Sequence, residues 1–174
     1  MSELILVNEF DEEIGTMEKM EVHRKGLLHR AFSVFIFDRQ GNMLLQQRAI
    51  SKYHNGGAWS NTCCSHPFPG ESTESAALRR LEEEMGFSVP LVKLFDFVYK
   101  VDFSNGLTEH EFDHVFIGNY DGDVNYNPSE VMDYSFRNMH DIRSSLDENP
   151  GQFTEWFRIT FPKLEDYWKS TFNS

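Results

Sequence analysis

The chain has 174 residues, of which 40% are hydrophobic, so it is long enough to form one domain with a sizeable core. Its formal net charge of −12 disfavours contact with nucleic acids and anionic membranes, and we expect no partner of either kind. No apolar run approaches the roughly 20 residues needed to cross a bilayer. The N-terminus lacks the basic region of a signal peptide.

The two cysteines are adjacent, at Cys63 and Cys64, and do not form a disulfide framework. Reduced thiols are typical of cytoplasmic proteins. We therefore predict a cytoplasmic protein with a single domain over residues 1–174. We also expect a monomer, because a charge of −12 opposes self-association.

Strands dominate the predicted structure of the first 50 residues. Apolar and β-branched runs predict them at 4–8, 16–20, 31–37 and 43–48. Turn-forming residues at 11–15 and 38–42 separate them. The last two strands should pair as a β-hairpin.

A loop with a thiol and an imidazole follows in the segment W-S-N-T-C-C-S-H-P, residues 59–67. Cys64 and His66 are two positions apart, so an extended backbone points both side chains to one side and Cys63 to the other. Cys64 is therefore the better candidate for chemistry. A lone cysteine is more often a small buried apolar residue, which is the simpler alternative.

The residues after this loop predict a helix that ends near Gly86, a residue suited to cap its C-terminus. Apolar side chains recur there at three- and four-residue steps, at Ala77, Leu78, Leu81 and Met85. Arg80, Glu83 and Glu84 share another face. Such a glutamate run is often only a solvated surface, but next to the loop it indicates a site for an anionic substrate held through a metal ion.

In the second half, the predicted strands come first and the predicted helices follow. Strands are predicted at 91–103, from 109 to 120, and at 130–136, with a turn at 104–106 and a loop at 121–129. Met139, Ile142 and Leu146 predict a helix that ends before 149, and the aromatic tail from 154 to 172 a second one with a break or kink at Pro162. The chain thus belongs to the α+β class, with a mixed sheet and helices packed on it.

Alternation along the strand that begins near Glu109 separates its polar residues into two sets. Glu109 and Glu111 point to one face, and His110 and His114 to the other. We therefore keep the two glutamates as candidates for a site and leave out the two histidines.

The helix and the loop before it resemble the Nudix signature G-x5-E-x7-R-E-U-x-E-E-x-G-U, in which U is aliphatic. The positions in register are Glu71, Arg79, Leu81, Glu83, Glu84 and Gly86. Ser65 replaces the first glycine, and Arg80 replaces the glutamate after the arginine. This altered box argues against hydrolysis by the usual set of carboxylates.

The stretch S-K-Y-H-N-G-G-A-W-S-N-T-C-C-S-H-P, the altered box, the E-x-E strand and the late aromatic segment together resemble type 1 isopentenyl-diphosphate isomerases, from Glu18 to Trp156. This resemblance implies a Nudix-like mixed β-sheet sandwiched between helices. It implies reversible isomerisation of isopentenyl diphosphate to dimethylallyl diphosphate, by protonation and deprotonation through a carbocation-like intermediate.

The resemblance also implies roles for individual residues. Cys64 and Glu111 would be the catalytic acid and base, Tyr99 would hydrogen-bond the catalytic carboxylate, and Trp156 would cover the hydrocarbon end. The implied ligands of one divalent metal are His23, His29, His66, Glu109 and Glu111. Glu84 would help to bind a second ion, Mg²⁺, shared with the diphosphate. The implied diphosphate-binding cations are Lys19, Arg48, Lys52 and Arg80.

Three imidazoles with two carboxylates suit a borderline ion such as Mn²⁺, Fe²⁺ or Zn²⁺ better than Mg²⁺, which prefers oxygen ligands. We expect Mn²⁺ there, with Zn²⁺, Fe²⁺ or Mg²⁺ as alternatives. For single residues the simpler alternatives are that Trp156 and Tyr99 are structural and that Lys19 and Lys52 are solvated. For the whole chain they are a Nudix hydrolase of a nucleoside diphosphate derivative and a non-catalytic Nudix-fold binding module.

Overall fold

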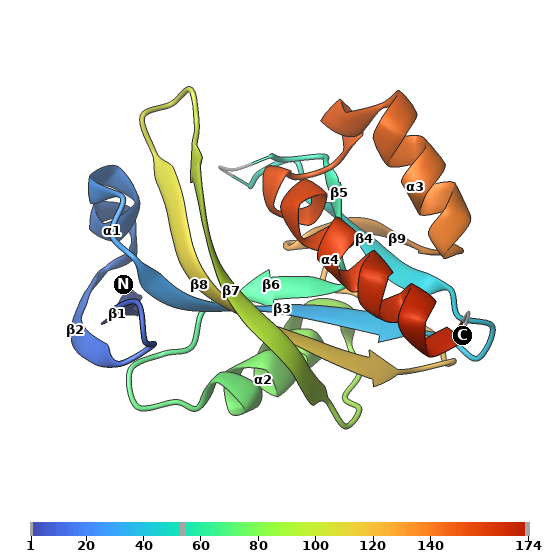
Figure 1. The fold of residues 1–174 in the computed structure, drawn as a ribbon, viewed down its shortest axis with the longest axis horizontal. Coiled ribbons are helices and arrows are strands. Elements are labelled where there is room, and N and C mark those ends of the chain that lie inside the picture. Colours follow the sequence, from blue (N-terminus) through green and yellow to red (C-terminus); the bar gives the residue numbers. More distant parts are fainter. Residues whose placement is uncertain (1, 53–54, 173–174) are drawn as a thin grey trace.

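The computed structural model describes residues 2–52 and 55–172 (Figure 1). Tyr53 and His54, which belong to the stretch that carried the resemblance, lie outside the described residues. The strands are β1 (Glu3–Val7), β2 (Glu13–Glu18), β3 (His29–Phe37), β4 (Met43–Arg48), β5 (Trp59–Ser60), β6 (Cys63–Ser65), β7 (Val92–Asp102), β8 (Thr108–Asn119) and β9 (Val131–Arg137). The helices are α1 (Lys19–Lys25), α2 (Thr73–Met85), α3 (Met139–Glu148), the short 3-10 helix η1 (Pro150–Gln152) and α4 (Glu155–Phe172).

Strand β3 is the centre of a mixed sheet. It pairs in parallel with β8 along its whole length, from His29 opposite Glu111 to Phe37 opposite Asn119. On its other edge it pairs with the short strand β6 over residues 32–34. Strand β7 pairs antiparallel with β8 through the turn at 103–107. This pairing sets residues from β3, β6, β7 and β8 side by side.

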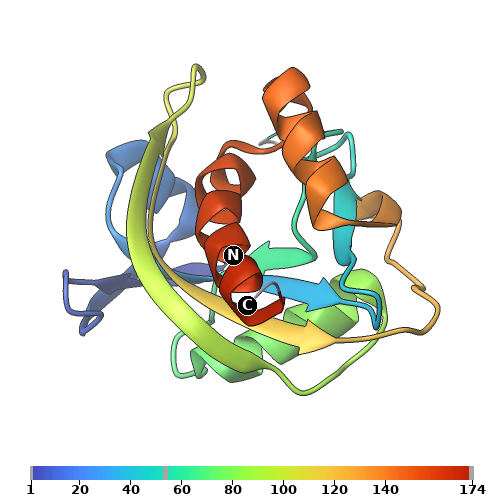
Figure 2. The same ribbon diagram turned by 45° about the vertical axis from the view of Figure 1, so that its right-hand side comes forward.

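The two faces of the sheet carry separate cores. On β3, Phe32, Val34 and Ile36 pack toward α2, whereas Phe35 and Phe37 pack toward α3 and α4. Figures 1 and 2 show α2 on one side of the curved sheet and α4 on the other, within the curve of β7 and β8. The mixed sheet between helices is confirmed. Among the described helices, none is long and apolar enough to span a membrane.

Helix α2 ends at Gly86 as predicted, and both of its ends are capped. The Ser72 hydroxyl accepts a hydrogen bond from the backbone N–H of Ser75 at 3.1 Å. Gly86 has φ of 78° and ends the helix in the left-handed conformation. A Cβ atom at Gly86 would overlap the carbonyl oxygen of Asn125, so glycine is required there on two counts.

We expect Gly86→Ala to lower the free energy of unfolding by more than Gly70→Ala does. Gly70 has a similar φ, 84°, but open space around it, so its alanine variant measures backbone strain alone, about 1–2 kcal/mol. The clash with Asn125 should add about 1–3 kcal/mol in the Gly86 variant. Urea unfolding of the two variants measures the difference, and equal losses would contradict the close approach.

Three predictions for local structure were wrong. Residues 13–15 belong to β2 instead of a turn, and Lys19 and Met20 begin α1 instead of ending a strand. The sequence did not predict helix α1, because its N-cap residue, Glu18, is not one of the types preferred at that position. The Glu18 carboxylate accepts hydrogen bonds from the N–H groups of Met20 and Glu21. The predicted hairpin of β3 and β4 exists only at its turn, at Phe37 opposite Met43. Beyond that point β4 pairs with β5 and β9 instead.

A break or kink was predicted at Pro162, and helix α4 runs through this residue without a break, from Glu155 to Phe172. The helix buries Phe157, Phe161 and Leu164 against the sheet. Packing of this apolar face offsets the backbone hydrogen bond that proline cannot make.

Candidate active site

Three imidazoles and a carboxylate meet at the end of β3. His23 comes from α1, His29 from the first residue of β3, His66 from the segment after β6, and Glu109 from β8. One ligand atom from each lies within 4.8 Å of the others. Glu111 adjoins the group, with Oε2 at 3.0 Å from His66 Nε2 and 3.4 Å from His29 Nε2. The five implied ligands are therefore brought together, from four parts of the chain.

The hydrogen bonds of two histidines fit a bound cation. His23 donates its Nδ1–H to the carbonyl oxygen of Lys19 at 2.7 Å, and His29 donates its Nδ1–H to that of Leu27 at 3.0 Å. The Nε2 atom of each ring faces a carboxylate oxygen, that of His23 facing Glu109 at 3.0 Å and that of His29 facing Glu111 at 3.4 Å. A divalent cation between these nitrogen and oxygen atoms would be bound by both sets of acceptors, and the Nδ1 hydrogen bonds would orient the rings toward it.

The protonation of His66 agrees with this arrangement. Burial lowers its pKa to about 3, so the ring is neutral at physiological pH and its nitrogen is available as a ligand. Burial and the neighbouring Glu111 raise the pKa of Glu109. The cluster has the donor set of a divalent metal site.

Adding Mn²⁺ to metal-free protein should raise its melting temperature. A ligand at 100 times its Kd stabilises the folded state by about 2.7 kcal/mol, which corresponds to roughly 5–11 °C for a chain of this size. The His29→Ala variant should lose most of this increase, because His29 contributes a buried nitrogen to the cluster. Calorimetry with and without Mn²⁺ measures both, and an equal rise in the variant would contradict the site.

The Glu111 carboxylate contacts Tyr99, His29 and His66. Tyr99, its partner across the β7–β8 ladder, donates its hydroxyl to Glu111 Oε1 at 2.5 Å. Burial alone would raise the pKa of Glu111, but the neighbouring imidazoles of His29 and His66 outweigh burial and hold it well below its usual range. Glu111 is thus an ionised carboxylate with a fixed orientation. His110 and His114 lie outside the cluster, as strand alternation predicted.

Cys64 and Cys63 face opposite sides of β6, as predicted. The buried Cys63 donates its S–H to Glu84 on α2 at 3.0 Å. Cys64 Sγ lies 3.0 Å from Asn61 Oδ1 and 3.6 Å from Ser33 Oγ. Burial, and then the carboxylate of Asp113, raise the pKa of Cys64, so its resting form is the thiol.

These groups surround one cavity of about 100 Å³. Its lining residues are Lys19, Arg48, Lys52, Cys64, Ser65, His66, Arg80, Glu84, Tyr99, Glu109, Glu111 and Trp156. Of the predicted site residues, His23 and His29 do not line the cavity; both are fully buried in the adjacent histidine cluster. Trp156 enters the wall from α4, with the guanidinium of Arg48 at 5.0 Å over its ring. A thiol and a carboxylate therefore line the same cavity as an indole and four cations.

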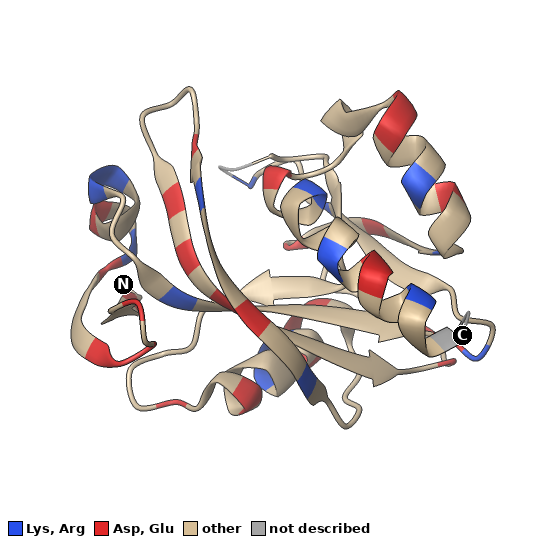
Figure 3. Ribbon diagram, viewed as in Figure 1, with Lys and Arg blue, Asp and Glu red and all other residues tan. Residues whose placement is uncertain are grey.

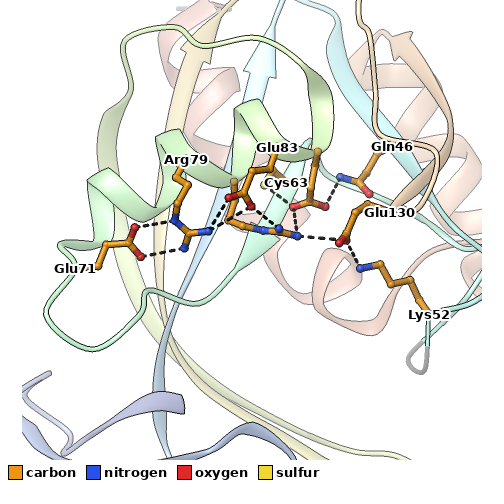
Figure 4. Close-up of polar contacts among 9 residues, drawn as sticks. Gln46, Lys52, Cys63, Glu71, Arg79, Glu83 and Glu130 are labelled. Carbon is orange, nitrogen blue, oxygen red and sulfur yellow. Dashed lines mark hydrogen bonds and ion pairs between the residues drawn. The ribbon is translucent and has the colours of Figure 1, made fainter. Parts of the chain in front are cut away.

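Two cations of this wall, Lys52 and Arg80, are paired with acidic residues, and so is Arg79, which precedes Arg80 on α2. Figure 4 shows Arg79 paired with Glu71 and Glu83, and Lys52 paired with Glu130. Arg80, which breaks the Nudix signature, contacts Glu83 at 2.7 Å and Glu130 at 3.2 Å. The opposite charges raise the pKa of Arg80 despite its burial. Acidic residues recur along β8 (Figure 3), and two of them, Glu109 and Glu111, line the same cavity as these cations.

Sequence reasoning missed four polar residues next to the site: Ser33, Asn61, Asp113 and Glu130. Ser33 and Asp113 interrupt the apolar residues of β3 and β8, and this interruption was the available signal. Asn61 lies in an extended segment where a buried polar role has no periodic pattern. Glu130 reaches the site only because β9 pairs with β4, which the sequence did not reveal.

Comparison with known proteins agrees with this fold. Residues 27–157 match the NUDIX domain family. The structure of DR0079 from Deinococcus radiodurans superposes with a TM-score of 0.79 at 18% identity, covering 93% of this chain and 98% of that one. The MutT protein from Methanosarcina mazei Go1 gives 0.64 at 20% identity, covering 80% and 94%. The fold and the match define a NUDIX-domain protein.

Two curated relatives show to which group within the NUDIX domain family the chain belongs. The isopentenyl-diphosphate Delta-isomerase of Pectobacterium atrosepticum is 49% identical over 170 residues, which cover 98% of this chain and 95% of that protein. Isopentenyl-diphosphate Delta-isomerase 1 of Aromatoleum aromaticum is 51% identical over 162 residues, which cover 93% and 92%. The chain belongs to the isopentenyl-diphosphate Delta-isomerases, within the NUDIX domain family.

Proposed function

We propose that this protein catalyses the reversible conversion of isopentenyl diphosphate to dimethylallyl diphosphate. One proton is added to the terminal CH₂ carbon of the alkene, which leaves a tertiary carbocation or a species close to it. A proton is then lost from the carbon on the other side, and the double bond forms there. The observation that carries the proposal is the thiol of Cys64 and the carboxylate of Glu111 in the wall of one cavity.

Cys64 and Glu111 are proposed as the two groups that exchange protons with the substrate, on opposite faces of it. The Cys64 thiol carries a proton and Glu111 is ionised, so one donor and one acceptor are present before the reaction starts. Because the reaction is reversible, the two groups exchange roles in the opposite direction. Tyr99 holds the Glu111 carboxylate in place by its hydrogen bond at 2.5 Å.

The cations Lys19, Arg48, Lys52 and Arg80 are proposed to bind the diphosphate. Glu84 would hold Mg²⁺ beside it, and the three histidines with Glu109 and Glu111 would hold a second divalent ion, Mn²⁺ or else Zn²⁺, Fe²⁺ or Mg²⁺. When bound, these ions supply positive charge that neutralises the diphosphate and the buried carboxylates. The protein residues then orient the alkene between Cys64 and Glu111.

Trp156 is proposed to cover the hydrocarbon end of the substrate. An indole face can stabilise a cation by about 2 kcal/mol or more in a desolvated site. Exclusion of water matters equally, because water would capture the carbocation. Trp156 is 8% exposed, lies against Arg48 and lines the cavity, which supports this role.

Other features support proposals for the domain organisation, oligomeric state and location of the protein. We propose that residues 1–174 act as one domain, since the N-terminal hairpin of β1 and β2 packs onto β3 and β8 through Ile5, Val7 and Phe112. We also propose a monomer in the cytoplasm, with the small-molecule substrate as its partner. The net charge of −12 and the two free cysteines support these proposals.

Proton NMR of isopentenyl diphosphate with the purified protein, Mg²⁺ and Mn²⁺ in D₂O tests the proposed function. We expect the methyl signals of dimethylallyl diphosphate, with deuterium in the product. Unchanged substrate would overturn the proposal, and a panel of nucleoside diphosphate derivatives would follow. Hydrolysis there would favour a Nudix hydrolase, and no reaction would favour a binding module.

A further inference from the structure

Asn61 has a buried side chain next to the reactive thiol, and the proposed reaction gives it no role. It is 1% exposed and lies between β5 and β6. Its Nδ2 donates hydrogen bonds to the carbonyl oxygens of Val34 and Cys63, each at 3.0 Å. These two acceptors fix which end of the amide carries the oxygen, since only the NH₂ group can donate.

The oxygen of the Asn61 amide is consequently directed at Cys64. Its Oδ1 lies 3.0 Å from Cys64 Sγ and 3.0 Å from Ser60 Oγ, and both of those groups can donate. The other neighbour of the thiol, the Ser33 hydroxyl, is farther away at 3.6 Å and donates its own proton to Asp113 at 2.8 Å. The nearest acceptor for the S–H of Cys64 is therefore the Asn61 amide.

We propose that Asn61 is a positioning residue for Cys64. By accepting the S–H hydrogen bond, its amide holds the thiol in one rotamer, with the sulfur in the cavity wall. The amide is itself held by two backbone carbonyls of β3 and β6, so the thiol is oriented from the centre of the sheet. The expected change in kcat rests on the proposed function, but the hydrogen bond between Cys64 and Asn61 can be observed whether or not the protein is an isomerase.

Raman spectroscopy of the S–H stretch, combined with steady-state kinetics, tests this proposal. The band of Cys64 is assigned by its loss in Cys64→Ala, and it should move to higher frequency in Asn61→Ala because the acceptor is gone. The same variant should lower kcat by about 10²-fold, the loss that a displacement of about 1 Å in a reacting group produces. KM should change little, because the cations that bind the diphosphate are untouched.

Ser60→Ala is the matched control, because it removes the other donor to the same Asn61 oxygen. Its S–H band and kcat should stay close to those of the original protein. If Asn61→Ala does not fold, Asn61→Leu replaces it: leucine keeps the branched shape of the side chain but has no acceptor, so the band should again move to higher frequency.

An unmoved S–H band in a folded Asn61 variant would overturn the proposal, and so would a moved band with unchanged kcat. Failure of the proposed function is distinguishable, because then the original protein would show no isomerisation while the band still reported the hydrogen bond.

Discussion

Replacing Cys64 by alanine should lower the rate of isomerisation by about 10³-fold or more, while the protein folds and keeps its metal ions. A positioned acid or base contributes typically 10²–10⁴-fold, and no other thiol lines the cavity among the described residues. Cys64 does not belong to the cluster of three histidines and Glu109, and its sulfur contacts Asn61 and Ser33, so metal content should not change. The NMR assay and metal analysis measure the two properties on one preparation.

Cys63→Ala is the matched control for this variant. Its thiol is fully buried and points to α2, where it donates to Glu84. We expect this variant to keep isomerisation within about tenfold of the original rate, since a lost hydrogen bond to a charged group costs about 1.5 kcal/mol. Substantial activity in a folded Cys64→Ala protein would remove Cys64 from the mechanism.

The parts of the site that the sequence predicted share one property: each follows from alternation within a single element. Strand alternation separated Glu109 and Glu111 from His110 and His114, and Cys64 from Cys63. The helical period and Gly86 predicted α2. Such patterns depend on local geometry alone, and tertiary contacts did not change them.

The parts that the sequence did not predict depend on which elements pair. His23 and His29 reach His66 because α1 precedes β3 and because β6 pairs with β3, and neither feature was predicted. Their expected proximity rested on the resemblance. Glu130 reaches Lys52 and Arg80 through the pairing of β4 with β9, in place of the predicted hairpin. Long-range pairing of this kind has no period in the sequence.

Replacing Glu111 by glutamine should lower isomerisation by about 10³-fold and should also weaken the metal site. Glutamine keeps the volume but cannot accept a proton, and it has one acceptor oxygen for Tyr99, His29 and His66 together. The metal Kd should rise by at least roughly 10- to 100-fold, the loss typical even for removal of an outer partner of a metal ligand.

Saturating metal separates the two roles of Glu111, with Glu109→Gln as the matched comparison. Glu109 belongs to the same cluster and the same face of β8, but Tyr99 does not donate to it. Excess Mn²⁺ should therefore restore activity in the Glu109 variant, since only a ligand was lost. It should not restore activity in the Glu111 variant, because the lost proton acceptor is not replaced by metal. Equal recovery of both variants would mean that Glu111 acts only as a metal ligand, and another group would then have to exchange the second proton.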